Sequence, residues 1–107
     1  MFAQASNLDL DAYLTAIRGG AAGSRSLELY APRLRSGDMA PGFKVAHFLK
    51  DLGIALDECR RLQLALPGLA LAHQLYTALA AYGDEELGTQ ALVRVLERLN
   101  NTKMRTL

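Results

Sequence analysis

Three side chains that could take part in chemistry lie close together in the sequence: His47, Lys50 and Asp51. The histidine precedes the lysine by about one helical turn, a spacing that is compatible with acid–base work. A lysine ammonium also attracts carboxylates and donates hydrogen bonds to the oxygen atoms of a ligand. Charged side chains on a helix are most often simply solvated, so these residue types alone do not establish a site.

The other residues that could carry chemistry form no recognisable site. His47 and His73 have no neighbouring cysteine or spaced carboxylates, so we predict no metal site. Cys59, the one cysteine of the chain, is predicted to be a small buried hydrophobe, which fits a reducing compartment. The run from Gly19 to Gly23 follows a predicted helix, not a strand, and lacks the G-x-G-x-x-G spacing. We therefore interpret it as a helix–helix corner and not as a phosphate loop.

The helix that must position Lys50 is predicted from about residue 43 to residue 63. A turn at Pro41-Gly42 precedes it. Its apolar residues recur at helical spacing and define a buried face: Val45, Phe48, Leu49, Leu52, Ala55, Leu56, Cys59 and Leu62. Gly53 inside this helix costs about 1 kcal/mol relative to alanine. Its presence suggests the close approach of a neighbouring helix or of a ligand.

The amino-terminal part is predicted to be helical and interrupted by turns. Residues 2–6 resemble the last turn of a helix, and the next helix is capped by Asn7 or Asp9 and ended by a left-handed Gly19-Gly20. Ser24 is expected to cap a short helix that Pro32 stops near Tyr30.

The carboxyl-terminal part is also predicted to be helical. Pro67 opens a helix that is apolar on nearly every side and is therefore expected to be central and buried. Thr89 is expected to cap the last helix, whose apolar stripe is Leu92, Val95, Leu96 and Leu99. Residues 100–107 are expected to fray.

Composition limits the class of protein. A chain of 107 residues has the length of one domain, half of its residues are apolar, and its net charge is +1. This charge gives no electrostatic reason to expect a nucleic-acid or anionic-membrane partner. No stretch is long and apolar enough to span a bilayer, and residues 1–6 are too short and polar for a signal peptide. We therefore expect a cytoplasmic protein.

Several motifs resemble those of one enzyme family. They are Gly19 to Ser24, the Pro-Gly-Phe at residues 41–43, the Lys-Asp-Leu-Gly-x-Ala at residues 50–55, and Leu66-Pro67. In this order they resemble the C-terminal helical domain of the β-hydroxyacid dehydrogenases, the family of 3-hydroxyisobutyrate dehydrogenase and tartronate semialdehyde reductase. The resemblance runs from Leu8 to about Leu99, which is nearly the whole chain.

The resemblance implies a fold and a set of site residues. The fold is an all-α, multi-helical bundle over residues 1–107, similar to the C-terminal domain of 6-phosphogluconate dehydrogenase. Lys50 matches the family's cofactor-contacting lysine. Phe43 matches a family aromatic near the substrate, with a hydrophobic anchor as the alternative. Asp51 follows Lys50 directly and is expected to orient it or to contact the substrate, with a surface charge as the alternative. No catalytic role matches His47.

The resemblance also implies partners. The intact enzyme would use NAD or NADP to oxidise a small 3-hydroxy acid, or to reduce the semialdehyde, and would be a homo-oligomer. Its nucleotide-binding domain and catalytic lysine are expected upstream of this chain, so the isolated chain is expected to be inactive and to bind no dinucleotide. The alternative is a stand-alone helical interaction module, which the reading frame upstream of Met1 would distinguish.

Overall fold

The computed structural model describes all residues from 1 to 107. Two compact units make up the chain: Met1–Met39 with Thr102–Leu107, and Ala40–Asn101. Six α-helices and one short 3-10 helix are the regular elements, and Lys44 and Gly88 form an isolated bridge. The prediction of an all-α protein is confirmed. That the two units act as a single domain stays a prediction. No helix combines the length and the hydropathy needed to cross a membrane.

The first unit contains helices α1 (Phe2–Ala5), α2 (Leu10–Arg18) and α3 (Arg25–Ser36). The side chain of Asp9 accepts a hydrogen bond from the Ala12 amide at 2.7 Å, so this residue is the cap of α2. Ser24 caps α3 in the same way, as predicted, through the Leu27 amide at 3.0 Å. Gly19 follows α2 with a φ of −81°. The predicted left-handed cap there is therefore wrong.

Helix α3 does not stop near Tyr30, because it continues through Pro32 to Ser36. A proline inside a helix removes one backbone hydrogen bond, here the one to the Glu28 carbonyl. Burial of Ala31, the residue before Pro32, holds this turn against the unit. The end of the helix is set instead by Gly37, whose φ of +75° is left-handed.

Residues 102–107, predicted to fray, are hydrogen-bonded to the rest of the first unit. The Gln4 side chain donates to the Lys103 carbonyl at 2.7 Å and accepts from the Arg105 amide at 2.6 Å. The Leu107 amide donates to the Arg35 carbonyl at 2.7 Å. The two ends of the sequence therefore complete one unit.

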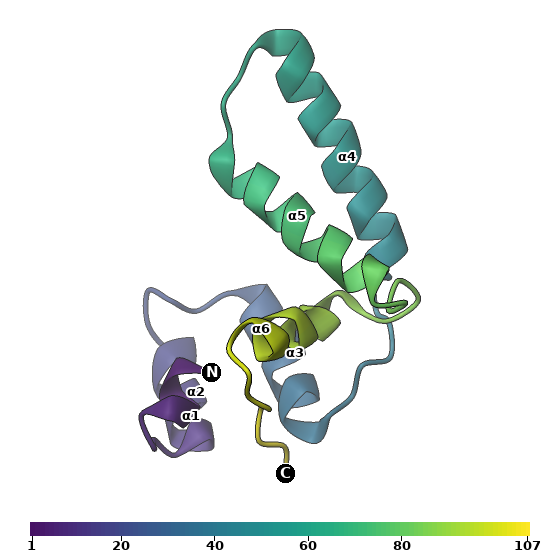
Figure 1. The fold of residues 1–107 in the computed structure, drawn as a ribbon. Coiled ribbons are helices and arrows are strands. Elements are labelled where there is room, and N and C mark those ends of the chain that lie inside the picture. The colour runs from purple at the N-terminus through teal and green to yellow at the C-terminus, as the bar shows by residue number, and fades with distance from the viewer. The chain divides into compact units, whose positions relative to one another are not determined.

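The second unit contains α4 (Val45–Leu62), α5 (Pro67–Ala81), a 3-10 helix η1 (Thr89–Leu92) and α6 (Val93–Leu99). Helices α4 and α5 run side by side as a hairpin (Figure 1). Pro67 is the first residue of α5, as predicted. The core of the unit centres on Val45, Leu79 and Val95, which are nearly inaccessible. Cys59 is only half-buried, contrary to the expectation of a buried hydrophobe.

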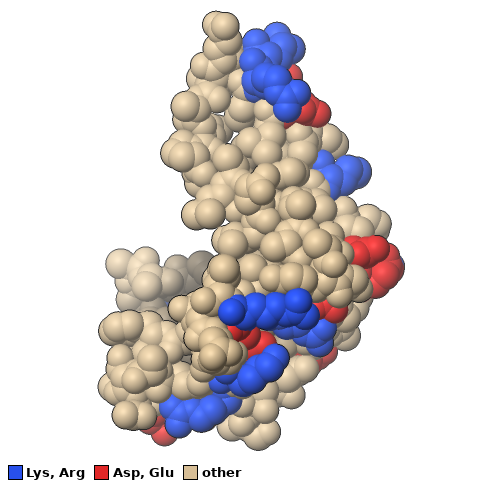
Figure 2. Space-filling view, viewed as in Figure 1, with Lys and Arg blue, Asp and Glu red and all other residues tan.

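The expectation that α5 is central and buried is wrong. Only Tyr76 and Leu79 of this helix are buried, and Leu71 is 61% exposed. The reason is that α5 has α4 as its main neighbour and meets η1 and α6 only near its carboxyl end, while its amino-terminal end diverges from α4 (Figure 1). In Figure 2 the α5 side of this hairpin is uncharged, whereas charged side chains follow α4.

The buried face of the last helical segment differs from the apolar stripe that the sequence predicted. It begins as the 3-10 helix η1 with Gly88 at the cap position, so the predicted Thr89 cap is wrong. Ala91, Val93 and Val95 are buried, whereas Leu96 and Leu99 are 37% and 68% exposed. A 3-10 turn has about three residues, so it shifts the buried face away from the one expected for a continuous α-helix.

Gly88 occupies a position where a side chain does not fit. A Cβ at this residue would lie 2.2 Å from the Gln90 Oε1 and 2.8 Å from the Ala40 carbonyl oxygen. Gln90 is itself 7% exposed, and its Nε2 donates to the same Ala40 carbonyl at 3.0 Å. Neither neighbour can move without disturbing this hydrogen bond.

We therefore predict that Gly88→Ala lowers the free energy of unfolding by about 1–3 kcal/mol, the usual range for overpacking. Urea unfolding measures the effect. Gly68→Ala is the matched control, because nothing lies within 4 Å of a Cβ there and alanine favours the helix. Equal stability of Gly88→Ala and the native chain would contradict the prediction.

Candidate functional site

The beginning of α4 is held by the loop that joins α5 to η1. The Val45 and Ala46 amides donate to the Leu87 and Glu85 carbonyls, each at 2.9 Å. The Phe43 carbonyl accepts from the Thr89 amide at 3.0 Å. Lys44 is the cap residue of α4, but its side chain makes no capping bond. Loop carbonyls therefore satisfy amides that a side chain or an anion would otherwise bind.

A row of aromatic rings connects this region to the core. The centroids of Phe43 and Phe48 are 5.8 Å apart, and those of Phe48 and Tyr76 are 4.9 Å apart in an edge-to-face arrangement. The Tyr76 hydroxyl donates to the Thr89 carbonyl at 2.9 Å. Phe43 is nevertheless 38% exposed. It contacts Phe48, as an anchor does, and also keeps part of its ring accessible to a ligand.

Lys50 and Asp51 lie on the exposed side of α4. Their side chains are 67% and 53% exposed, and Nζ of Lys50 is 3.6 Å from Oδ1 of Asp51. This separation is an ion pair but exceeds hydrogen-bond distance. The Lys50 ammonium therefore keeps its donors for water or for a ligand.

The predicted site residues lie in and just before the first two turns of α4. His47 and Lys50 are three residues apart within this helix, which places them on one face. Phe43 precedes the helix, which begins at Val45. The rings of Phe43 and His47 are 6.4 Å apart. The structure thus brings Phe43 and Lys50 onto one exposed strip, with Asp51 beside it.

Lys44 pairs with Glu86 of the loop, a contact that sequence reasoning missed. A hydrogen bond from the Lys44 ammonium, together with its positive charge, lowers the pKa of Glu86, and the charge of His47 acts in the same direction. No sequence signal distinguishes this pair, because its members lie far apart in the chain.

Gly53 does not mark a tight approach between helices of this chain. The nearest atom to a Cβ built there is Nε2 of His73, at 4.0 Å, which is ordinary contact. The expectation of a closely approaching neighbouring helix is therefore wrong within the chain. The expectation of a ligand at Gly53 stays a prediction.

Comparison with known proteins gives the family. A family profile described as "NAD-binding of NADP-dependent 3-hydroxyisobutyrate dehydrogenase" matches residues 1–96. The chain belongs to the 3-hydroxyisobutyrate dehydrogenase family. Among relatives, a probable 3-hydroxyisobutyrate dehydrogenase-like 1, mitochondrial, from Arabidopsis thaliana is 55% identical over 99% of this chain and 32% of its own length. A 2-hydroxy-3-oxopropionate reductase from Escherichia coli is 38% identical over 97% of this chain and 36% of its own.

A solved structure supports the fold. The crystal structure of a 3-hydroxyisobutyrate dehydrogenase from Salmonella typhimurium matches with a TM-score of 0.82 at 24% identity, over 88% of this chain and 33% of that one. The chain therefore spans about a third of the length of these members of the 3-hydroxyisobutyrate dehydrogenase family.

The Lys44–Glu86 pair yields a pH prediction. Because pairing depresses the folded-state pKa of Glu86, its stabilising effect is present above the unfolded-state pKa of about 4.3 and is lost as the pH falls through the lower folded-state value. We predict that Lys44→Met raises the pKa of Glu86, as measured by carboxyl-carbon NMR titration. Acid unfolding of the variant should then depend less steeply on pH below about 4.3.

Lys50→Met is the matched control, since Lys50 pairs with Asp51 and not with Glu86. The assignment fails if both variants change the Glu86 titration equally, or if neither changes it.

Proposed function

We propose that this chain is the C-terminal helical domain of an NAD(P)-dependent oxidoreductase acting on small 3-hydroxy acids or their semialdehydes, with a fold like the C-terminal domain of 6-phosphogluconate dehydrogenase. The observation that carries the proposal is the exposed strip of Phe43 and Lys50 at the amino-terminal end of α4, with an ammonium that no hydrogen bond occupies. Membership of the 3-hydroxyisobutyrate dehydrogenase family over residues 1–96 supports it.

Lys50 would bind the anionic part of the reacting complex. Its ammonium can attract a substrate carboxylate or donate to cofactor oxygens. Asp51, whose carboxylate is 3.6 Å away, would limit the directions in which the ammonium points. The partly exposed ring of Phe43 would contact the apolar part of the substrate. When bound, a nicotinamide cofactor supplies the hydride chemistry.

The second unit fits a peripheral contact with NAD(P) better than a complete binding site for it. A dinucleotide pyrophosphate is commonly held by free amides at the start of a helix. At the start of α4 the Val45 and Ala46 amides already donate to loop carbonyls. Lys50 therefore provides a side-chain contact, and the phosphate-binding turn belongs in the part of the enzyme that carries the dinucleotide fold.

The exposed apolar surface supports a homo-oligomer. Leu64, Leu66 and Leu71 around the α4–α5 turn are 54%, 51% and 61% exposed. Helix α5 has no charged residue that would keep such a surface hydrated. The same surface would serve the alternative function, a stand-alone interaction module without activity. An upstream reading frame that encodes a dinucleotide-binding segment would favour the enzyme, whereas a start codon at Met1 would favour the module.

Lys50→Ala tests the proposed function in the whole enzyme. We predict that kcat/KM falls by about 10- to 1,000-fold, the range for losing one charge-assisted contact in a site sheltered from water. Stability should hardly change, because the side chain is 67% exposed. Steady-state kinetics and titration of NAD(P)H fluorescence separate a substrate contact from a cofactor contact.

Arg60→Ala is the control, since Arg60 is a paired and 81% exposed cation on the same helix. Full activity of Lys50→Ala would contradict the proposed role of Lys50, and its unfolding would make the residue structural. The isolated 107-residue chain should transfer no hydride and bind no dinucleotide.

Association gives a separate prediction. The isolated chain should form a dimer or larger oligomer at tens of micromolar, burying more than about 1,000 Å² in total through helix faces that include α5. Leu71→Lys should reduce the mass measured by light scattering. Gln74→Lys, which adds the same charge at an exposed polar position of α5, should leave it unchanged. A monomeric native chain would contradict the prediction.

A further inference from the structure

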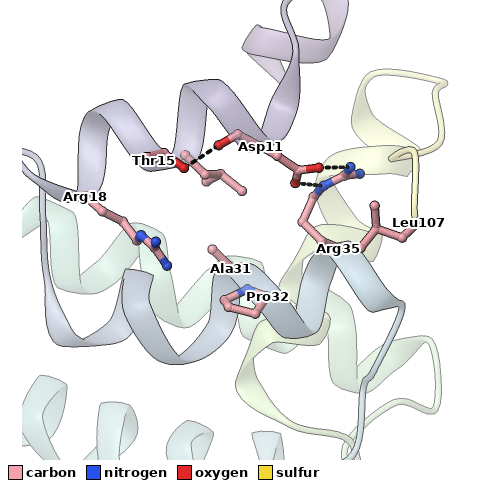
Figure 3. Close-up of a pocket in the computed structure, with 8 residues that line it drawn as sticks. Asp11, Thr15, Arg18, Ala31, Pro32, Arg35 and Leu107 are labelled. Atoms are coloured by element: carbon pink, nitrogen blue, oxygen red, sulfur yellow. Dashed lines mark hydrogen bonds and ion pairs between the residues drawn. The ribbon is translucent and has the colours of Figure 1, made fainter.

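Helices α2 and α3 of the first unit border a cavity of about 230 Å³. One side is formed by α2 and the other by α3, and Leu107 closes one end (Figure 3). Nothing in the proposed function uses this cavity, because Phe43, Lys50 and Asp51 belong to the second unit.

Part of the cavity wall is apolar. It is formed by Leu14, Ala31, Pro32 and Leu107, and Ala31 is only 6% exposed. Pro32 presents its ring and has no backbone N–H. This part of the cavity therefore suits a short hydrocarbon group.

One charged group of the cavity, Arg35, is already paired within the unit. Its Nε and Nη2 donate to the two carboxylate oxygens of Asp11 at 3.0 and 3.3 Å, and its Nη1 donates to the Arg105 carbonyl at 2.7 Å. The arginine side chain is 11% exposed. These contacts, with hydrogen bonding as the main cause, lower the pKa of Asp11. Asp11 and Arg35 thus form a neutral, structural pair.

The other arginine, Arg18, is not engaged. The structure gives its guanidinium no hydrogen bond and no ion pair, and Figure 3 shows its side chain directed toward Ala31 and Pro32. The neighbouring Thr15 hydroxyl already donates to the Asp11 carbonyl at 2.8 Å. The last turn of α2 favours a cation through the helix dipole. That effect accounts for the charge but not for the direction of the side chain.

We propose that this cavity binds a small monocarboxylate with a short apolar chain. The carboxylate would take two parallel hydrogen bonds from the Arg18 guanidinium, and the hydrocarbon would lie against Leu14, Ala31 and Pro32. Because the charges of Asp11 and Arg35 cancel, Arg18 is the one uncompensated charged side chain of the wall, which suits a monoanion. The carboxylate of Asp11 disfavours a doubly charged phosphate.

The test is an amide NMR titration of the full chain with butyrate, inorganic phosphate and butylammonium. We expect butyrate to shift the amides of Leu14, Arg18 and Ala31 saturably, with a dissociation constant on the order of millimolar, as befits a ligand of this size. Butylammonium should not shift them, and phosphate should bind at least about tenfold more weakly, since it lacks the hydrocarbon.

Arg18→Gln should weaken butyrate binding at least about tenfold, as expected for losing a charge-assisted pair. Arg25→Gln is the matched control, because Arg25 pairs with Glu28 and does not line the cavity. Circular dichroism checks that both variants are folded. Equal binding of butyrate and phosphate, unchanged binding by Arg18→Gln, or no saturable shift in the native chain would each overturn the proposal.

Discussion

The second unit depends on two backbone hydrogen bonds at the start of α4. The Val45 and Ala46 amides donate to carbonyls of Leu87 and Glu85, so a loop about forty residues away in the sequence caps this helix. The first amides of a helix have no partner inside it, and Lys44 supplies no side-chain acceptor. Without this loop, α4 would lose its cap, and Phe43 would lose the backbone bond that positions it.

Other contacts reinforce the same junction. The Tyr76 hydroxyl reaches the Thr89 carbonyl, the Gln90 amide reaches the Ala40 carbonyl, and Lys44 pairs with Glu86. Arg94 pairs with Asp84 at 2.8 Å at the beginning of the loop. These contacts join residues 40–44, α5, the loop, η1 and α6, so the orientation of α4, and with it the exposed strip, is determined by the whole unit.

Local sequence signals predicted which segments are helical better than they predicted which side chains those helices bury. Caps at Asp9 and Ser24 and the start of α5 at Pro67 were correct, because these signals act through neighbouring residues. The end of α3 was wrong, since tertiary burial of Ala31 outweighed the break expected at Pro32. The burial of α5 was wrong, because apolar character shows what a helix can bury and not how many neighbours it meets. The exposed position of Lys50 followed from helical spacing, whereas the position of Phe43 before the helix and the Lys44–Glu86 pair depend on the folded loop.

The hydrogen bonds that join residues 102–107 to Gln4 and Arg35 impose an order on folding during synthesis. The second unit is continuous in sequence, from Ala40 to Asn101, so it needs no later segment to be complete. The first unit is discontinuous, and its amino-terminal helices cannot form these hydrogen bonds until residues 102–107 have been made. Closing such a long loop is entropically unfavourable and slow relative to local contacts. The nascent chain can therefore complete its second unit before its first, the reverse of the order in which their first residues are translated.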